Sequence, residues 1–378
     1  MAEKYIISID QSTQGTKALL FNSIGDLILR SDLPHKQIIN EKGWVSHDPE
    51  EIYFNTVQVV KNLIEKSGIN KNDIIALGIS NQRETSVIWD RITGKPLDNA
   101  IVWQCSRASE ICQRDNIKIH AETIRKKTGM NLSPYFPAAK IALLLENVEN
   151  ASNKAKENTV CHGTIDSWLV FKLTEGKSYK TDYSNASRTQ LFNIFDLKWD
   201  EEICNWFGID VKNLPEVTES NQIYGETTFD GYLDKPIPIH GVLGDSHAAL
   251  FGQGCLNPGM IKTTYGTGSS IMMNIGDKPV LSEHGVVTSL AWAKDGKVYY
   301  VLEGNLNYTG AVITWLKNDM QLISSPSETT ELAQKAFKDD NLYLVPAFTG
   351  LGAPYWDSQA RAAAVGMDRT TGRAEFVR

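Results

Sequence analysis

The sequence contains little cysteine: five residues among 378, dispersed along the chain and odd in number. They are Cys105, Cys112, Cys161, Cys204 and Cys255. Small secreted domains depend on paired cysteines, and zinc sites need cysteine or histidine at short, regular spacings. This chain has neither pattern. We therefore expect a reduced protein of the cytoplasm with no cysteine-held metal.

Long hydrophobic runs and basic blocks are also missing. The apolar residues 5–9 are too short for the core of a signal peptide, and no window approaches the ~20 residues that a membrane helix needs. The net charge is −7 at pH 7 and is spread along the chain. We therefore expect neither membrane insertion nor nucleic-acid binding. An anionic substrate would have to be held by local turns and a metal ion.

What the chain does contain is two similar turns, far apart in the sequence. Residues 8–17 read Ser-Ile-Asp-Gln-Ser-Thr-Gln-Gly-Thr-Lys, and residues 262–270 read Lys-Thr-Thr-Tyr-Gly-Thr-Gly-Ser-Ser. Each pattern predicts a strand, a tight turn and a strand. Backbone N–H groups and hydroxyls converge in such turns, which suits phosphoryl oxygens. Two of them indicate a nucleotide held between two related lobes, although one such turn alone is more often structural.

The remaining pattern predicts an α/β protein with mixed sheets. Strands are expected at 5–10 and 74–79, and residues 48–51, Asp-Pro-Glu-Glu, form a helix start signal. Residues 107–230 are more polar and helical. The pattern of strands and helices restarts near Pro236, which indicates an internal duplication. For 378 residues, two domains are the natural expectation.

Seven motifs follow one another along the chain. They are Asp10-Gln11-Ser12-Thr13, Asn81-Gln82-Arg83-Glu84-Thr85, Trp103-Gln104-Cys105, Pro134-Tyr135-Phe136, Asn185-Ala186-Ser187-Arg188-Thr189, Thr264-Tyr265-Gly266-Thr267-Gly268 and residues 348–356. Together they resemble the motifs of the FGGY carbohydrate kinases, most closely the glycerol kinases. The resemblance implies an actin/hexokinase/Hsp70-like fold with two RNase H-like domains around a nucleotide cleft. It places the N-terminal domain at 1–250 and an incomplete C-terminal domain at 251–378.

Asp245 is the candidate catalytic base. It follows an apolar stretch and opens a helical pattern, where a carboxylate could accept the proton of an attacking hydroxyl. From the residues alone the alternative is equally good, because Asp is a favoured helix N-cap. The resemblance implies that Asp245 is the base. We expect the nearby His247, in the first turn of the same helix, to be structural.

Asp10 is the candidate Mg²⁺ ligand, because one carboxylate at a phosphate-binding turn can hold a hydrated Mg²⁺ ion. The alternative is a turn residue that stabilises the hairpin. The resemblance implies ATP as the phosphoryl donor and Mg²⁺ as the ion that accompanies it. It assigns the nucleotide to Thr13, Gln14, Gly15, Lys17, Thr267, Gly310 and Thr314.

Arg83 and Glu84 are adjacent charges at the end of a buried strand, so each needs a partner in the other, in the backbone or in a ligand. A guanidinium and a carboxylate together suit the hydroxyls of a polyol. Trp103 and Tyr135 would add an aromatic wall, although either residue taken alone is more often core packing. The substrate residues implied by the resemblance are Arg83, Glu84, Trp103, Tyr135, Asp245, Ser246 and Ser270.

The chain also departs from the family pattern. Ser246 stands where the family usually has glutamine, and Ser270 stands where it has an aromatic residue, which indicates a roomier pocket with more hydroxyls. Thr314 replaces another glutamine, and residues 143–144 lack the tryptophan of the first family signature. Tyr232 aligns with the histidine that some relatives use for regulation by phosphorylation, so that control is not expected here.

These observations predict ATP-dependent phosphorylation of a terminal hydroxyl of glycerol. An alternative is a kinase for a larger polyol or ketose, such as a tetritol, pentitol or ketopentose. An alternative of another class is an inactive sugar- or nucleotide-binding module. Residues 363–378 begin the family's second signature and stop inside it, so we expect a truncated chain whose own activity is in question. The resemblance implies a homo-oligomer, a dimer or tetramer, when the protein is intact.

Overall fold

The computed structural model describes the chain from residue 3 to residue 378, except residues 267, 340, 349 and 358. It forms two compact units, each described here by itself. Unit 1 comprises Met1–Pro258, Asn274–Leu281 and Thr288–Val301. Unit 2 comprises Gly259–Met273, Ser282–Val287 and Leu302–Arg378. The domain boundary expected at residue 250 stays a prediction.

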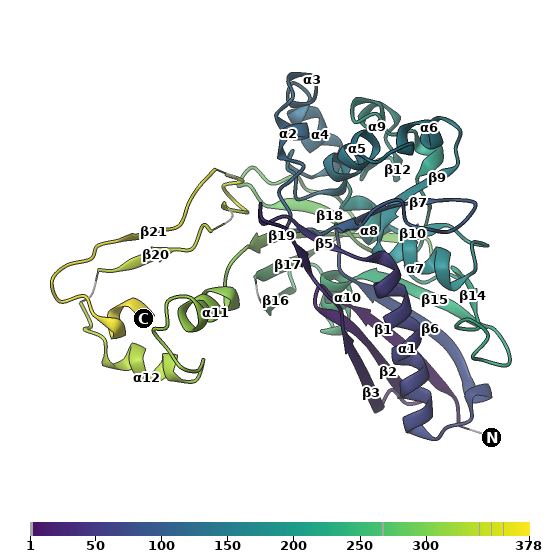
Figure 1. Ribbon diagram of the computed structural model, residues 1–378, viewed down its shortest axis with the longest axis horizontal. Helices are drawn as coiled ribbons and strands as arrows, with labels where there is room; N and C mark the ends of the chain where they lie inside the picture. The colour runs from purple at the N-terminus through teal and green to yellow at the C-terminus, as the bar shows by residue number, and fades with distance from the viewer. Residues whose placement is uncertain (1–2, 267, 340, 349, 358) are drawn as a thin grey trace. The chain divides into compact units, whose positions relative to one another are not determined.

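A six-stranded mixed sheet forms the centre of unit 1 (Figure 1). Its order is β14 (Gly225–Thr227), β15 (Ile237–Gly244), β6 (Ile74–Asn81), β1 (Tyr5–Gln11), β2 (Gly15–Asn22) and β3 (Leu27–Pro34). The inner strands β15, β6 and β1 are parallel, while β2, β3 and β14 run antiparallel to their neighbours. The register pairs Gln11 with Asn81 and Asn81 with Gly244. The carboxyl ends of all three parallel strands therefore meet at one edge of the sheet.

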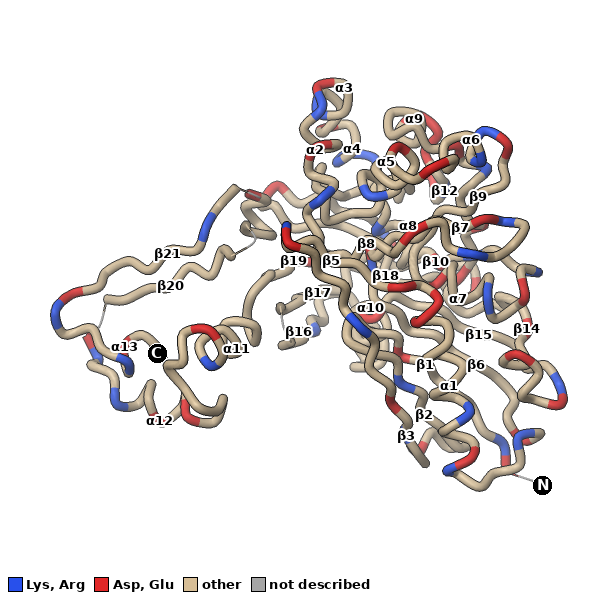
Figure 2. Tube along the Cα trace, viewed as in Figure 1, with Lys and Arg blue, Asp and Glu red and all other residues tan. Residues whose placement is uncertain are grey.

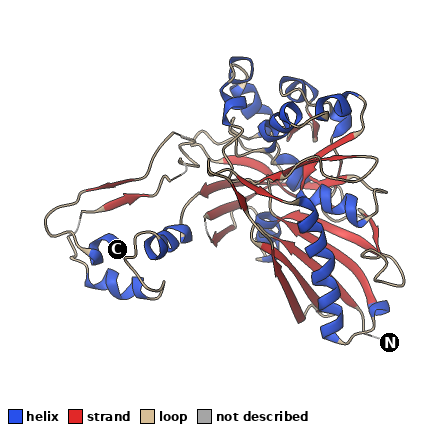
Figure 3. Cartoon of the chain, viewed as in Figure 1, coloured by secondary structure: helices blue, strands red, loops and turns tan. Residues whose placement is uncertain are grey.

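Helix α1 (Pro49–Ser67) begins where the sequence predicts it. The Asp48 side chain accepts a hydrogen bond from the Glu50 amide, and Gly68 ends the helix in the left-handed conformation. The helix contacts β2 and β3, and Figure 3 shows it along one face of the sheet. Helix α7 (Ile165–Leu173) contacts β6 and β15. Buried aliphatic residues of α1, α7 and the sheet form one apolar cluster.

A second sheet and several short helices complete most of unit 1. The sheet has the order β4 (Ile38–Ile39), β5 (Val45–His47), β8 (Ala100–Ile101), β7 (Ser86–Asp90) and β9 (Val160–Thr164). The other helices are α2 (Ser109–Gln113), α3 (Asp115–Lys118), α4 (Ala121–Thr128), α5 (Pro137–Asn147), α6 (Ala151–Lys156), α8 (Tyr183–Ser187), α9 (Glu201–Trp206) and α10 (Asp245–Gly252). Two small strand pairs are β10 (Lys180–Asp182) with β13 (Glu216–Thr218), and β11 (Phe192–Asn193) with β12 (Lys198–Trp199). Short 3₁₀ helices occupy Lys71–Asp73 and Val211–Asn213.

The later part of the chain contains a four-stranded sheet. Its order is β16 (Ile261–Tyr265), β17 (Ser269–Gly276), β19 (Lys297–Leu306) and β18 (Val287–Lys294). The strands of this sheet include residues of both units, and unit 2 also contains α11 (Gly310–Asn318), α12 (Glu328–Lys335), β20 (Tyr343–Val345), β21 (Ala363–Val365) and α13 (Arg373–Val377). The strands β20 and β21 pair with each other and are largely exposed.

The prediction of an α/β protein with mixed sheets is confirmed. Both strand–turn–strand units form as expected, β1 with β2 and β16 with β17. Figure 2 shows acidic and basic residues interspersed along the part of the chain that the structure describes. Across those same residues, no helix is both long and apolar enough to cross a membrane.

Candidate active site

The candidate site of unit 1 lies where β1, β6 and β15 end. Asp10 is the penultimate residue of β1, Arg83 and Glu84 follow β6, and Asp245 follows β15. Because the three strands are adjacent and parallel, their carboxyl ends bring these distant parts of the sequence to the same edge. The sheet topology therefore assembles four of the predicted site residues.

The turn between β1 and β2 is closed by its own hydrogen bonds. The Ser12 amide and hydroxyl donate to the Gly15 carbonyl oxygen at 2.9 and 3.0 Å. Gly15 passes close to β3, because a Cβ atom placed on it would lie 2.6 Å from the Leu33 carbonyl oxygen. Glycine is thus required there by close packing, whatever the turn binds. Thr13 is half-buried and Gln14 is exposed.

Asp10 and Lys17 form an ion pair across this hairpin. The Lys17 Nζ lies 2.7 Å from Asp10 Oδ2, and both side chains are about one third exposed. The sequence assigned Lys17 to phosphate and Asp10 to Mg²⁺. The structure places each of them beside the other and near the first turn. Any ligand that binds both residues must compete with, or rearrange, this pair.

Asp245 is the first residue of α10, and the N-cap residue is Gly244. The interpretation of Asp245 as a helix cap is therefore wrong. Its Oδ1 accepts a hydrogen bond from the Ser246 amide at 2.6 Å and lies 3.2 Å from Arg83 Nε. Arg83 packs over Gly244, where a Cβ atom would come within 2.7 Å of the Arg83 stem. A glycine before Asp245 is what lets this guanidinium reach the carboxylate.

The electrostatic surroundings of Asp245 suit a proton acceptor. Two fifths of its side chain is exposed, yet the surrounding protein desolvates the carboxylate and raises its pKa. The Arg83 charge opposes this rise, while Glu84 and Asp10 add to it. A base works best when its pKa lies near the working pH, so a raised carboxylate pKa favours proton transfer.

Glu84 pairs with Arg188, which is not among the site residues predicted from the sequence. The Arg188 Nε lies 2.5 Å from Glu84 Oε1, and the side chains are 0% and 2% exposed. The Arg188 guanidinium also lies over the Phe136 ring, 5.2 Å from its centroid. The signal in the sequence was a single charge within the motif at residues 185–189. The partners of Arg83 and Glu84 are therefore Asp245 and Arg188.

Trp103 and Tyr135 are half-buried neighbours whose ring centres lie 5.7 Å apart in an edge-to-face arrangement. The Trp103 indole N–H donates to the Thr13 hydroxyl at 2.9 Å, and its backbone amide donates to the Thr85 hydroxyl at 3.2 Å. Trp103 therefore connects the first turn with the segment that follows β6. Both rings are partly exposed, so each can contribute apolar surface to a ligand.

Ser246 and His247 lie in the first turn of α10. Ser246 is half-buried, and its backbone amide is held by the Asp245 carboxylate. His247 is buried, with its Nε2 3.3 Å from the Ser289 hydroxyl. The structural role expected for His247 stays a prediction.

The remaining predicted residues belong to unit 2. The Ser270 hydroxyl donates to Glu303 Oε1 at 2.9 Å, so it is already engaged by a carboxylate that is 1% exposed. The Gly310 amide donates to the Gly266 carbonyl oxygen at 2.9 Å, which joins the start of α11 to the second turn. The Thr314 hydroxyl points back along α11 to the Gly310 carbonyl oxygen, 3.4 Å away. Thr267 lies outside the described residues.

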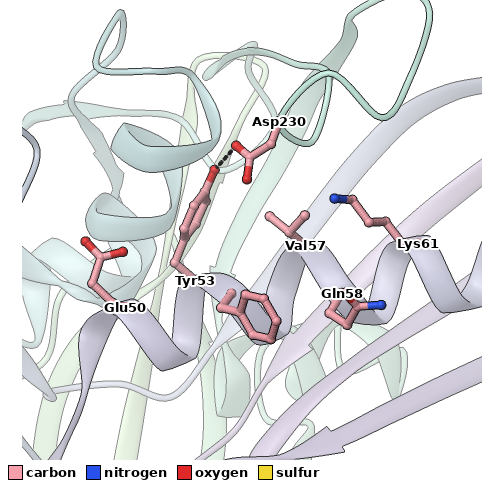
Figure 4. Close-up of a pocket in the computed structure, with 7 residues that line it drawn as sticks. Glu50, Tyr53, Val57, Gln58, Lys61 and Asp230 are labelled. Atoms are coloured by element: carbon pink, nitrogen blue, oxygen red, sulfur yellow. Dashed lines mark hydrogen bonds between the residues drawn. The ribbon is translucent and has the colours of Figure 1, made fainter.

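A separate hollow occurs on the exposed side of α1 (Figure 4). Its volume is about 390 Å³. There the Tyr53 hydroxyl donates to Asp230 at 2.5 Å, and Figure 4 shows this bond between two of the lining side chains. The residues that line it are Glu50, Tyr53, Phe54, Val57, Gln58, Lys61 and Asp230. None of them is a predicted site residue.

Comparison with known proteins shows that this chain is an ATP-dependent kinase with the actin/hexokinase-like fold. The charged side chains at the ends of the parallel strands are consistent with that class. The chain belongs to the FGGY family of carbohydrate kinases. The model of the family's N-terminal domain matches residues 5–252, and that of its C-terminal domain matches residues 261–378.

Individual relatives agree with this assignment. The chain is 49% identical to glycerol kinase 1 of Thermotoga maritima over 374 residues, which cover 99% of this chain and 76% of the relative. The crystal structure of Plasmodium falciparum glycerol kinase with ADP matches with a TM-score of 0.85 at 37% identity, covering 99% of this chain and 75% of that one. A ligand-bound xylulose kinase from Lactobacillus acidophilus matches with a TM-score of 0.85 at 25% identity, with the same coverage.

These matches span nearly all of this chain and about three quarters of each relative. They do not support the truncation expected from the last residues of the sequence.

Proposed function

We propose that this protein transfers the γ-phosphoryl group of ATP to a terminal hydroxyl of glycerol and forms sn-glycerol 3-phosphate. The observation that carries the proposal is the 49% identity, over 99% of the chain, to a protein named glycerol kinase 1. The position of Asp245 beside Arg83 supports it, because this pair provides the proton acceptor that the reaction needs.

Asp245 takes the proton in the proposed reaction. As the hydroxyl oxygen of the substrate bonds to the γ-phosphorus, its proton passes to the Asp245 carboxylate. The bond between that phosphorus and the β–γ bridging oxygen breaks, and ADP leaves with the electron pair. Arg83 Nε, 3.2 Å from Asp245 Oδ1, orients the carboxylate. The exposed part of the Asp245 side chain then lets the proton pass to solvent.

The polyol would lie against the side chains near Asp245. We assign its hydroxyls to Arg83, Glu84 and Ser246 and its carbon chain to the aromatic pair. The residues proposed to bind it are Arg83, Glu84, Trp103, Tyr135, Asp245, Ser246 and Ser270. The edge-to-face rings of Trp103 and Tyr135 support this assignment, because sugar and polyol sites commonly combine an aromatic wall with charged hydrogen-bonding groups.

The first turn is proposed to bind the phosphates of ATP through its hydroxyl and amide donors. The residues assigned to the nucleotide are Thr13, Gln14, Gly15, Lys17, Thr267, Gly310 and Thr314. Asp10 fits a Mg²⁺ ion, since its carboxylate is a hard oxygen ligand, partly exposed, at the end of β1. When bound, Mg²⁺ neutralises charge on the phosphoryl oxygens. Lys17 stabilises the Asp10 carboxylate within the hairpin.

The proposal is tested by an ADP-release assay on the purified chain with glycerol, erythritol, xylitol and D-xylulose, together with calorimetric titration of each alcohol. We expect glycerol to be bound and phosphorylated in preference to the others. A preference for a four- or five-carbon substrate would favour the larger-substrate alternative, which the small residues Ser246 and Ser270 suggest in the sequence. Binding without any turnover would favour the inactive module.

Two further properties remain proposals. We infer a cytoplasmic protein from the cysteine content, and a dimer or tetramer from the family resemblance. Light scattering coupled to size-exclusion chromatography measures the second property directly. A monomeric mass over the working concentration range would exclude the predicted oligomer.

A further inference from the structure

Lys140 is a completely buried lysine on α5. Its side-chain nitrogen is surrounded by hydrogen-bond acceptors, which an apolar residue at this position would not use. Its relative exposure is 0%, and α5 is otherwise buried by aliphatic residues such as Ile141 and Leu144. Transferring an ammonium group from water into such surroundings is costly unless hydrogen bonds compensate for it. The contacts of Lys140 therefore indicate what its presence achieves.

The Lys140 Nζ contacts three backbone carbonyl oxygens. It donates to the Tyr135 carbonyl, and it lies 3.4 Å from the carbonyl oxygens of Glu84 and Trp103. An ammonium group has three N–H donors and no acceptor, which matches three carbonyls, whereas a neutral amine has only two donors. The three contacted residues lie on three separate segments, after β6, after β8 and before α5. All three are residues proposed to bind the polyol.

Glu84 shows why such a group is needed. Its φ angle is 58°, in the left-handed region that non-glycine residues seldom occupy. A residue in this conformation persists only where its surroundings hold it, and such residues gather at functional sites. The Glu84 carboxylate is held by Arg188 and its carbonyl by Lys140. Both ends of the residue are therefore held by buried basic side chains.

We propose that Lys140 is a positioning residue that fixes the Glu84, Trp103 and Tyr135 segments in the arrangement that binds the substrate. It acts through backbone carbonyls and touches no reacting atom. The inference rests on the proposed function for the identity of the ligand, a polyol. The rival explanation is that Lys140 contributes only to the stability of unit 1.

The decisive comparison is between Lys140→Met and Leu144→Ala. Lys140→Met keeps an unbranched apolar side chain, one atom shorter, and removes the three donors. Leu144→Ala, one turn further along α5, leaves a cavity in the same apolar cluster and contacts none of the three carbonyls. We expect Lys140→Met to raise KM and the calorimetric Kd for the polyol by roughly ten- to a hundredfold, because small displacements of site groups have effects of this size. KM for ATP should change little, and Leu144→Ala should change neither constant.

Lys140→Arg serves as the conservative variant, since it restores a permanent cation and should recover part of the lost affinity. Equal losses of melting temperature in Lys140→Met and Leu144→Ala, with unchanged polyol KM in both, would overturn the proposal. A chain that binds and phosphorylates none of the alcohols would instead contradict the proposed function. If the chain is inactive, amide hydrogen exchange still tests whether Lys140 holds the three segments in place. Residues 83–86, 102–104 and 134–136 should exchange faster in Lys140→Met and not in Leu144→Ala, and unchanged exchange there would also overturn the proposal.

Discussion

The turn between β1 and β2 and the turn between β16 and β17 have similar sequences but are supported differently. The first closes on itself through Ser12 and Gly15, and β1 is paired on both sides, with β2 and β6. The second belongs to β16, which is an edge strand of its sheet. Its Gly266 carbonyl accepts hydrogen bonds from the Thr309 hydroxyl and the Gly310 amide, more than forty residues later.

The strand before the first turn, β1, is also more buried than the strand before the second, β16. Alternate residues of β1 are buried, whereas four of the five residues of β16 are exposed, and Tyr265 is 83% exposed. Unit 1 contains two large apolar clusters. Among the described residues of unit 2, the buried apolar side chains are Met272, Val287, Leu316, Ile323, Ala347 and Ala353. Similar local sequences thus form antiparallel strand pairs in both places, while the burial around the two pairs differs.

The largest expected effect comes from Asp245, the proposed proton acceptor, which lies in unit 1. Asp245→Asn removes the proton acceptor and keeps the size of the side chain, so kcat should fall by about a hundred- to ten-thousandfold while polyol binding is retained. Steady-state kinetics and calorimetry measure the two quantities. Asp230→Asn, in the hollow beside α1, is the matched control and should leave kcat unchanged. Full turnover by Asp245→Asn would remove Asp245 from the mechanism.

The buried Glu84–Arg188 pair predicts the next effect. Arg188→Met leaves the Glu84 carboxylate buried without its partner, so the free energy of unfolding should fall by about 3–5 kcal/mol. Urea unfolding followed by tryptophan fluorescence measures this loss. Arg30→Met breaks the exposed Arg30–Asp32 pair and should have little effect. If the two variants unfolded at the same urea concentration, the buried Glu84–Arg188 pair would contribute no more to stability than the exposed pair, contrary to the prediction.

The contrast between the two units predicts different local stabilities. Backbone amides of β20 and β21 should exchange with solvent faster than those of β1 and β6, by roughly tenfold or more, because exposed hydrogen bonds open with a low free energy. Native-state hydrogen exchange measured by mass spectrometry resolves these segments. Equal protection across them would contradict the comparison of the two units.

The smallest effect concerns pH. Burial raises the pKa of Asp166 to about 6, partly opposed by hydrogen bonds from the hydroxyls of Thr164 and Thr181. The folded state therefore holds a proton that the unfolded state loses near pH 4. This contribution to stability is complete below about pH 4 and is lost as the pH rises through about 6. Asp166→Asn should flatten the pH dependence of the unfolding free energy between these values, and an unaltered profile would exclude Asp166 as its source.

Local sequence signals predicted the local structure well. Asp48 and Gly68 delimit α1 as expected, and both strand–turn–strand units form because hydrophobic alternation and turn residues act over a few positions. Asp245 shows the limit of such local signals. Its sequence fits a helix cap, yet Gly244 occupies the cap position, and a larger residue there would clash with the Arg83 side chain. A single sequence does not show which distant side chain will occupy the space beside a residue.

The sequence by itself determined the α/β class, the two turns and the family motifs that name Asp10, Arg83, Glu84 and Asp245 as candidates. These depend on residue types at short spacings, which local propensity and chemistry decide. Only the tertiary structure decided the partners: Arg188 for Glu84, Asp245 for Arg83, and three site carbonyls for Lys140. Burial creates those pairings, because a charge removed from water must find a partner among whatever residues the fold brings within reach.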